Sequence, residues 1–171
     1  MISDFKELLK SFNAHAVKYL IVGGYAVSFH AQPRATKDLD IFIKADAENA
    51  KAVYDALAGF GAPLEGITPE DLGDSTKFIR FGREPVAVDL LPSIDGVDFD
   101  TAWKHRVSGV IDITSGLTAF FISEADLITS KIAAGRMRDL ADVEELRQAR
   151  ASQKSRSEKK TPKRKRNDSG W

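Results

Sequence analysis

The chain has 171 residues, of which 43% are hydrophobic, a composition typical of one globular domain rather than of a disordered chain. It contains no cysteine, which excludes disulfides, thiolate metal sites and cysteine nucleophiles. No apolar run reaches the roughly 18–20 residues of a membrane span. The N-terminus also lacks the basic start and apolar stretch of a signal peptide. We therefore expect a cytoplasmic protein with no membrane partner.

The formal net charge is zero, with 25 basic and 25 acidic residues, but the charges are unevenly distributed. Residues 151–171 carry eight basic and two acidic residues, which leaves residues 1–150 with a net charge of −6. This terminal segment has almost no apolar residues to bury, so we expect a folded domain over 1–150 and a disordered basic tail over 151–171. The tail either only aids solubility or forms an electrostatic arm for RNA or DNA.

Helical and strand patterns alternate through the first part of the chain. Apolar spacing of 3.6 predicts helices, and short apolar or alternating runs predict strands. The expected elements are a helix over Asp4–Ala14, a strand over Tyr19–Val22 stopped by Gly23 and Gly24, a short helix over Tyr25–Ala31, a strand over Asp38–Lys44 and a helix over Ala47–Ala58. Residues 59–73 hold four glycines and two prolines and are expected to form a loop.

The second part predicts a hairpin, further short strands and two closing helices. The expected strands are Thr76–Phe81 and Val86–Leu91 around a turn at Gly82–Pro85, followed by Val107–Ile113 and Thr118–Ile122. Ser123 is expected to cap a helix that runs to Ala134, and a last helix covers Asp139–Arg150. These elements together predict a mixed α+β fold, a small sheet flanked by helices.

Two carboxylates lie on one face of the strand expected over Asp38–Lys44. Asp38 and Asp40 point to the same side because side chains alternate along a strand. The opposite side is fully apolar (Leu39, Ile41 and Ile43) and must pack on a core. The carboxylate side is therefore a rim or a cleft, where such a pair suits Mg²⁺. The alternative is the exposed face of an edge strand.

Two further features support a functional role for this pair of carboxylates. Gly23 and Gly24 follow a strand and precede a helix, a place where the backbone can approach a phosphate. Asp89 interrupts an apolar strand and needs a partner, and hairpin pairing could set it beside the strand of Asp38 and Asp40. Three carboxylates could then hold two metal ions. The alternative for Asp89 is a strand end satisfied by backbone N–H groups. Other candidates for the third acid are Asp95, Asp98, Asp100 and Asp112.

The glycine pair, the Arg34-x-Thr36-x-Asp38-x-Asp40 run and a later Asp89 together resemble the nucleotidyltransferase superfamily that includes DNA polymerase β. The resemblance implies the nucleotidyltransferase fold, with the triphosphate at Gly23 and Gly24 and two Mg²⁺ ions on the three acids. In place of the serine found in many relatives, this chain has Gly24, so phosphate contacts there must be mainly backbone.

Residues 127–143 are similar to the lysine and Arg-Asp-Leu-x-Asp signature of small bacterial nucleotidyltransferases of the abortive-infection (AbiEii-like) toxin group. This resemblance implies that Lys131 assists triphosphate binding, although it could also be an ordinary exposed lysine. It also implies a toxin whose partner is an antitoxin. Arg34 could meet a phosphate or pair with Asp38. Arg136, Arg138, Asp139 and Asp142 could instead form a structural set of salt bridges.

The leading hypothesis is a Mg²⁺-dependent enzyme that transfers a nucleoside monophosphate from a nucleoside triphosphate to a hydroxyl of RNA, protein or a small molecule. Asp38, Asp40 and Asp89 would be the catalytic and metal-binding residues, and Asp89 would accept the proton of the attacking hydroxyl. A homodimer would suit so short a chain. The alternatives are a catalytically silent nucleotide- or RNA-binding module, and an antitoxin or regulatory partner on the same fold.

Overall fold

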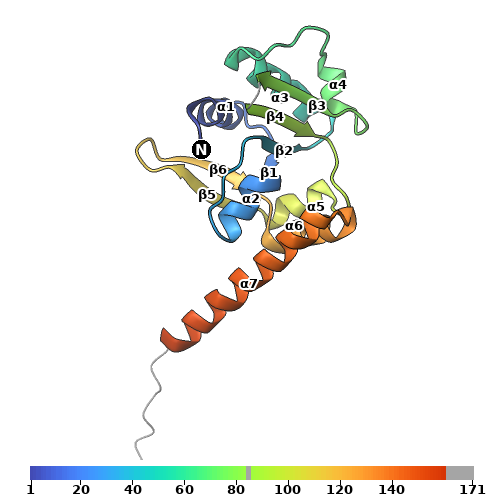
Figure 1. Cartoon of the computed structure of the whole chain (residues 1–171). Coiled ribbons are helices and arrows are strands. Elements are labelled where there is room, and N and C mark those ends of the chain that lie inside the picture. The colour runs from blue at the N-terminus through green and yellow to red at the C-terminus, as the bar shows by residue number, and fades with distance from the viewer. Residues whose placement is uncertain (84–85, 161–171) are drawn as a thin grey trace, which may run out of the picture.

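The computed structural model describes residues 1–83 and 86–160, and Figure 1 shows how their elements are arranged. In chain order, the elements of this part are α1 (Ser3–Ala14), β1 (Tyr19–Ile21), α2 (Gly23–His30), β2 (Leu39–Ile43), α3 (Ala47–Phe60), α4 (Pro69–Gly73), β3 (Ile79–Arg83), β4 (Val86–Leu91), α5 (Phe99–His105), β5 (Val107–Asp112), β6 (Leu117–Phe121), α6 (Glu124–Ala134) and α7 (Met137–Lys160). The mixed α+β prediction is confirmed.

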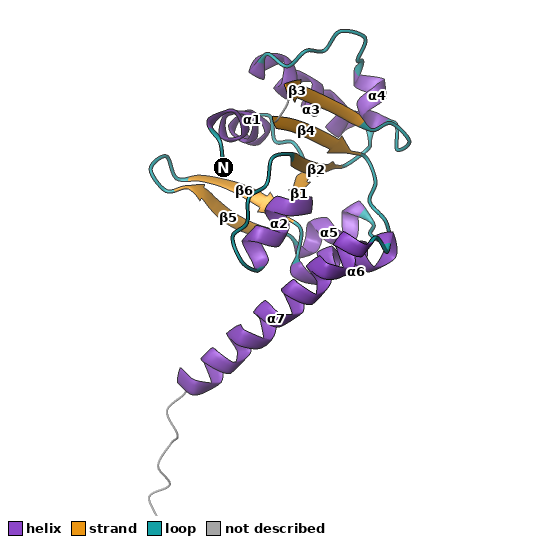
Figure 2. Ribbon diagram, in the orientation of Figure 1, coloured by secondary structure: helices purple, strands orange, loops and turns teal. Residues whose placement is uncertain are grey.

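The strands form one six-stranded sheet in the order β3-β4-β2-β1-β6-β5. The pairs β1–β2, β3–β4 and β5–β6 are antiparallel, whereas β2–β4 and β1–β6 are parallel. Figure 2 shows helices flanking this sheet, with α6 beside the start of α7. The strand β2 thus lies inside the sheet, between β4 and β1, and its position is set by backbone hydrogen bonds on both edges.

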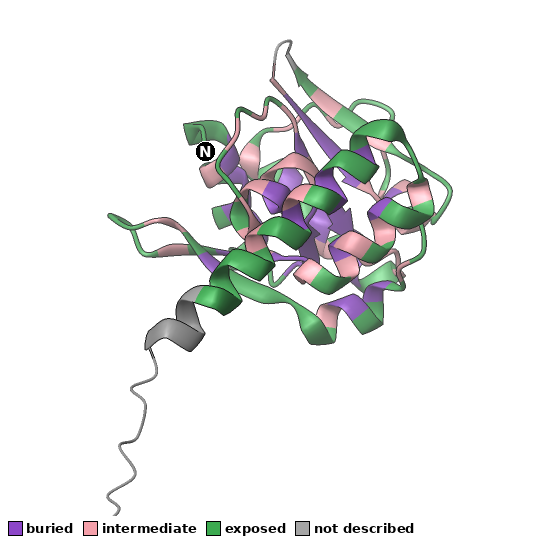
Figure 3. Ribbon diagram, turned by 60° about the horizontal axis from the view of Figure 1, so that its bottom comes forward, coloured by how far each residue is buried: buried purple, intermediate pink, exposed green. Residues whose placement is uncertain are grey.

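The core lies around β1 and β2 (Figure 3). All three residues of β1 are buried, as are Leu39, Ile41 and Ile43 of β2, as the alternating pattern predicts. Phe42 is buried as well, although it lies on the side of β2 that carries Asp40. Its ring meets that of Phe99 in α5, with centroids 4.9 Å apart. The side of β2 that carries Asp40 is therefore covered by α5 near the end of the strand and is open at the beginning of the strand.

Two short helices were not predicted. The expected loop over residues 59–73 contains α4, which begins with Pro69 and is held by a capping box between Thr68 and Asp71. The helix α5 is capped by Asp98, whose side chain accepts from the N–H of Thr101. Each helix is too short for an apolar period to be visible, so only the cap residues could have indicated them.

The last helix is longer than predicted, at 24 residues. It continues through Lys160, so the prediction of disorder was wrong for the stretch 151–160, while residues 161–171 of the tail lie outside the described part. Alanine, glutamine, lysine and arginine favour helix, and an existing helix grows without the cost of nucleation. Up to residue 155, Leu146 is the last buried side chain, and beyond it the helix extends away from the body (Figure 3).

Within the described residues, the model contains no helix with the length and apolar character that would let it cross a bilayer.

Asn49 is a buried polar residue that ties α3 to the ends of two strands. Its side-chain oxygen accepts from the N–H of Lys18 at 2.7 Å. Its amide nitrogen donates to the carbonyls of Lys18 at 3.0 Å and Lys44 at 2.9 Å. Lys18 directly precedes β1 and Lys44 directly follows β2.

We expect Asn49→Ala to lower the free energy of unfolding by about 2–3 kcal/mol, because it leaves backbone groups at the strand ends without partners. Urea denaturation measures this change. The control is Lys51→Ala, which alters an exposed side chain of the same helix. A loss for Asn49→Ala no larger than that of the control would contradict this role.

Candidate functional site

A cleft of about 750 Å³ opens between the start of α2, the segment that leads into β2, and the helices α6 and α7. Most of the predicted site residues line it, namely Gly23, Gly24, Asp38, Asp40 and Lys131. Asp89 is the exception and does not line the cleft. Residues from the first third of the chain and from its last two helices thus meet at one place, as their separate motifs predicted.

Asp38 and Asp40 lie at the beginning of β2, on the side that faces the cleft. The Asp38 side chain is 37% exposed, whereas Leu39 between them is buried. The alternative of an exposed edge strand does not hold, because β2 has neighbours on both edges. Two carboxylates at the open part of an interior strand need a compensating charge from the cleft.

The glycine pair brings the start of α2 against Asp40. Gly23 has a φ of +58°, and a Cβ atom there would collide with Oδ2 of Asp40. A Cβ atom on Gly24 would lie 2.9 Å from the side chain of Thr36. The backbone of Gly24 also hydrogen-bonds to the Asp40 carboxylate. Glycine was predicted here for phosphate approach, and the close approach of the carboxylate is a second reason for it.

Asp89 lies next to Asp40, on a strand that was expected beside the strand of Asp38 and Asp40. The strand β4 runs parallel to β2 with Asp89 as the register partner of Asp40. The residue is only 8% exposed, so its charge needs a partner. Nη1 of Arg80 donates to both of its oxygens, at 3.1 and 2.9 Å. Nη2 of the same guanidinium donates to Oδ2 of Asp38 at 3.2 Å.

Arg80 did not appear among the predicted site residues. It lies opposite Asp89 in the β3–β4 hairpin. The turn expected at Gly82–Pro85 would instead have paired Arg80 with Ala87, so the predicted register did not indicate this contact. The backbone N–H alternative for Asp89 is thus replaced by a side-chain cation.

The ionised form of Asp40 is disfavoured by its burial and by the neighbouring carboxylates. Burial, and then the charges of Asp89 and Asp38, raise the pKa of Asp40 to about 6, against the opposing effects of the Gly24 backbone and Lys131. Burial also raises the pKa of Asp89, although the charge of Arg80 opposes it. Carboxylate oxygens of this kind are hard ligands, which fit a divalent cation such as Mg²⁺. Among the described residues, no group of three acidic or histidine side chains surrounds a single point, so Asp38 and Asp40 are the pair that fits best.

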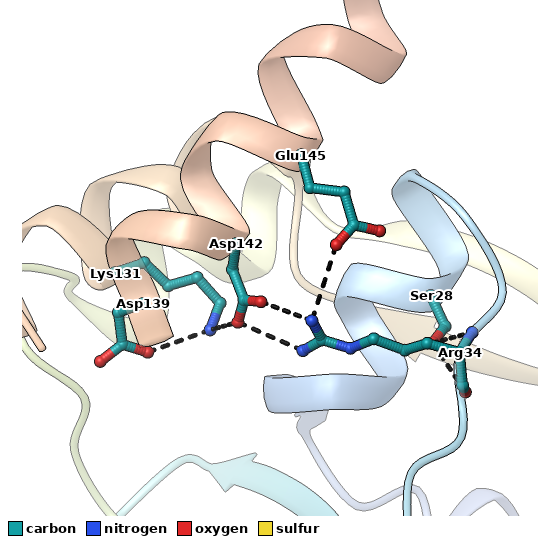
Figure 4. Close-up of polar contacts among 6 residues, drawn as sticks. All are labelled: Ser28, Arg34, Lys131, Asp139, Asp142 and Glu145. Atoms are coloured by element: carbon teal, nitrogen blue, oxygen red, sulfur yellow. Dashed lines mark hydrogen bonds and ion pairs between the residues drawn. The ribbon is translucent and has the colours of Figure 1, made fainter. Parts of the chain in front are cut away.

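Lys131 is buried beneath the opposite wall of the cleft, and Figure 4 shows its partners. Its ammonium donates to Oδ1 of Asp139 at 3.1 Å and to Oδ2 of Asp142 at 2.6 Å. It is therefore not the exposed lysine of the alternative interpretation. Although burial raises the pKa of Asp142, hydrogen bonds from Arg34 and Lys131 outweigh it and hold that pKa below its usual value.

Arg34 belongs to the same ion network. Its guanidinium donates to both oxygens of Asp142, at 2.5 and 3.2 Å, and lies 3.7 Å from Glu145 (Figure 4). Of the two alternatives left open for Arg34, the pairing with Asp38 is not found, because α7 brings a better-buried carboxylate to the guanidinium. Arg136 donates to Asp139 at 2.6 Å. The alternative set of salt bridges is thus present in part: Arg136, Asp139 and Asp142 belong to it together with Lys131 and Arg34, whereas no ion pair of Arg138 is found within the described residues.

Arg136 keeps 78% of its side chain exposed while lining the cleft. Together with the exposed Lys37 and Arg138, it supplies accessible positive charge there. The cleft thus has carboxylates on the side of the sheet and cations at its rim, an arrangement that can bind a metal ion and a polyphosphate together.

Three of the four other candidates for the third acid form structural contacts outside the cleft. Asp98 caps α5, Asp100 pairs with Lys44 at 2.9 Å, and Asp112 pairs with Lys6 at 3.1 Å. Only Asp95 of the four lines the cleft.

The matched family model is described as a nucleotidyltransferase of unknown function (DUF6036), and it matches residues 1–150. No curated protein matches the chain. The matched range contains every residue that lines the cleft, together with the whole sheet. Since the match covers most of the sequence, the chain belongs to the DUF6036 family of nucleotidyltransferases.

Proposed function

We propose that this protein transfers a nucleoside monophosphate from a nucleoside triphosphate to an acceptor hydroxyl in a Mg²⁺-dependent reaction. The observation that carries the proposal is the pair Asp38 and Asp40, which lines a cleft at the glycine start of α2. Family membership supports nucleotidyl transfer in general. The carboxylate pair, facing a rim of exposed cations, supports the dependence on a metal and a polyphosphate.

In the proposed reaction, the acceptor hydroxyl loses its proton to solvent water and its oxygen forms a bond to the α-phosphorus. The bond between that phosphorus and the bridging oxygen to the β-phosphate breaks, and pyrophosphate leaves. Asp38 and Asp40 would hold Mg²⁺, which supplies charge stabilisation at the reacting phosphate. The N–H groups at the start of α2 and the exposed Arg136 would orient the triphosphate. The buried Lys131 would act through Asp139 and Asp142, with which it is paired.

The acceptor would be RNA, a protein hydroxyl or a small molecule, and incubation with each labelled nucleoside triphosphate, Mg²⁺ and cell lysate identifies it from the labelled product. The similarity of residues 127–143 to AbiEii-like toxins supports a toxin role with an antitoxin partner. Growth arrest on expression, relieved in the variant described next, tests that role. Nucleotide binding that is independent of Mg²⁺ and without any transfer would favour a silent binding module.

The double substitution Asp38→Asn with Asp40→Asn should reduce nucleotide transfer at least about a hundredfold while the fold is kept, since both carboxylates on the cleft are neutralised. A labelled-nucleotide assay measures the rate, and circular dichroism checks the fold. Asp55→Asn, an exposed site on α3, is the matched control and should leave the rate unchanged. Wild-type transfer in the double variant would disprove the assignment.

Gly23→Ala should abolish Mg²⁺ binding, because the new methyl group would displace the Asp40 carboxylate. Gly116→Ala is the matched control, since Gly116 also has a positive φ, of +68°, but a Cβ atom there would meet nothing within 4 Å. Both variants carry the backbone strain, and only the first carries the collision. Calorimetric titration with Mg²⁺ measures the difference. Equal Mg²⁺ affinity in the two variants would contradict the role of Gly23.

Asp40→Asn should stabilise the metal-free protein at pH 8 by up to about 3 kcal/mol relative to the wild type. The pKa of Asp40 is about 6 in the fold, above its ordinary value of 3.8, so the folded state holds a proton that the unfolded chain has already released. Wild-type stability from this group is present below pH 3.8 and is lost as the pH rises through 6. The advantage of the variant should therefore vanish at pH 3.5.

Thermal unfolding in a chelating buffer, repeated across this pH range, measures the effect. Adding Mg²⁺ at pH 8 should raise the unfolding temperature of the wild type and leave that of Asp40→Asn unchanged. A variant less stable than the wild type at pH 8 would refute the proposed cost of ionising Asp40.

A further inference from the structure

We propose that the guanidinium of Arg80 takes the place of a second metal ion in this site. The cleft would then bind one divalent cation through Asp38 and Asp40, while Asp89 serves to hold Arg80. The inference rests on the proposed function, because it concerns the same group of carboxylates. It makes Asp89 a positioning residue, in contrast to the three-acid, two-ion arrangement that the family resemblance implies.

The first observation is the geometry of Arg80 itself. Its guanidinium bridges two carboxylates, donating to both oxygens of Asp89 at 3.1 and 2.9 Å and to Oδ2 of Asp38 at 3.2 Å. A second ion shared by these two acids would lie between them, where this guanidinium lies. Two cations cannot share that position without strong repulsion.

The second observation is the different environment of the two register partners. Asp40 and Asp89 lie side by side on parallel strands, yet Asp40 lines the cleft and Asp89 does not. In the contact between Arg80 and Asp38, Oδ2 of Asp38 accepts from the guanidinium, on a side chain that is 37% exposed. The described residues also lack any group of three acidic or histidine side chains around one point. The arrangement therefore provides a metal site formed by two carboxylates, those of Asp38 and Asp40.

The third observation is the balance of charge. Before a nucleotide binds, three ionised carboxylates are neutralised by one dication together with one guanidinium, whereas two dications would leave the group with excess positive charge. A guanidinium suits this position because its planar fork can donate to two acids at once. Arg80 comes from β3, at the edge of the sheet, and reaches past β4 to the start of β2.

The test is a Mn²⁺ titration of the full chain without nucleotide, with free Mn²⁺ followed by electron paramagnetic resonance. We expect the wild type to bind one Mn²⁺ ion. Asp40→Asn should weaken its affinity at least about a hundredfold, whereas Asp89→Asn should stay within about fivefold of the wild type. The two variants are matched controls, since the same substitution is made at register partners.

Arg80→Gln should bind a second Mn²⁺ ion, because it frees both carboxylates, and Arg80→Lys should remain at one ion, because it keeps the charge. Circular dichroism verifies that each variant is folded. If Arg80→Gln does not fold, the comparison of Asp40→Asn with Asp89→Asn decides the question.

Two Mn²⁺ ions in the wild type, equal losses in Asp40→Asn and Asp89→Asn, or a single ion in folded Arg80→Gln would each overturn the role of Arg80. Those results would leave the metal-dependent function in place. If neither the wild type nor any variant binds Mn²⁺, the proposed function fails as well.

Discussion

The close approach of the Gly23 backbone to the carboxylate of Asp40 is the contact on which the cleft depends. It joins the start of α2 to the beginning of β2, and no larger residue fits at that point. Since β2 is fixed by both neighbouring strands, the carboxylate has a defined position in the fold. The helix then presents its free N–H groups beside a concentrated negative charge, an arrangement that needs a cation to be neutral.

The local motifs could be predicted from the sequence because each is a short-range pattern. The apolar alternation around Asp40, the glycine pair and the apolar strand around Asp89 indicated a cleft with acids beside a glycine turn. The strand of Asp89 was expected beside the strand of Asp38 and Asp40, and the parallel pairing of β2 with β4 confirms it, while the exact register of Asp89 with Asp40 was not predicted. The acids themselves were therefore identified from sequence, although their role as metal ligands stays a prediction.

The partners of these charges could not be predicted, because they depend on long-range packing. Arg34 precedes the acid strand, yet its partner Asp142 lies 108 residues away on α7. Lys131 likewise lies in a buried ion network that a helical pattern does not reveal. Arg80 was missed because the expected turn sets the hairpin register two residues away from the observed one, and because a charged residue on an edge strand usually indicates a solvated face. The extension of α7 over residues 151–160 was missed because a segment without apolar residues to bury was expected to be disordered.

The two walls of the cleft are held by different forces. The wall that carries Asp40 belongs to the interior of a sheet and is fixed by backbone hydrogen bonds. The segment around Arg34 has no strand or helix, and an ion pair fastens it to α7. An ion pair can exchange partners without breaking the main chain, although the burial of Asp142 protects this pair from screening by salt. The wall formed by the sheet is therefore rigid, whereas the segment around Arg34 can move. A change in the width of the cleft would begin at Asp142 rather than at the carboxylates of the sheet.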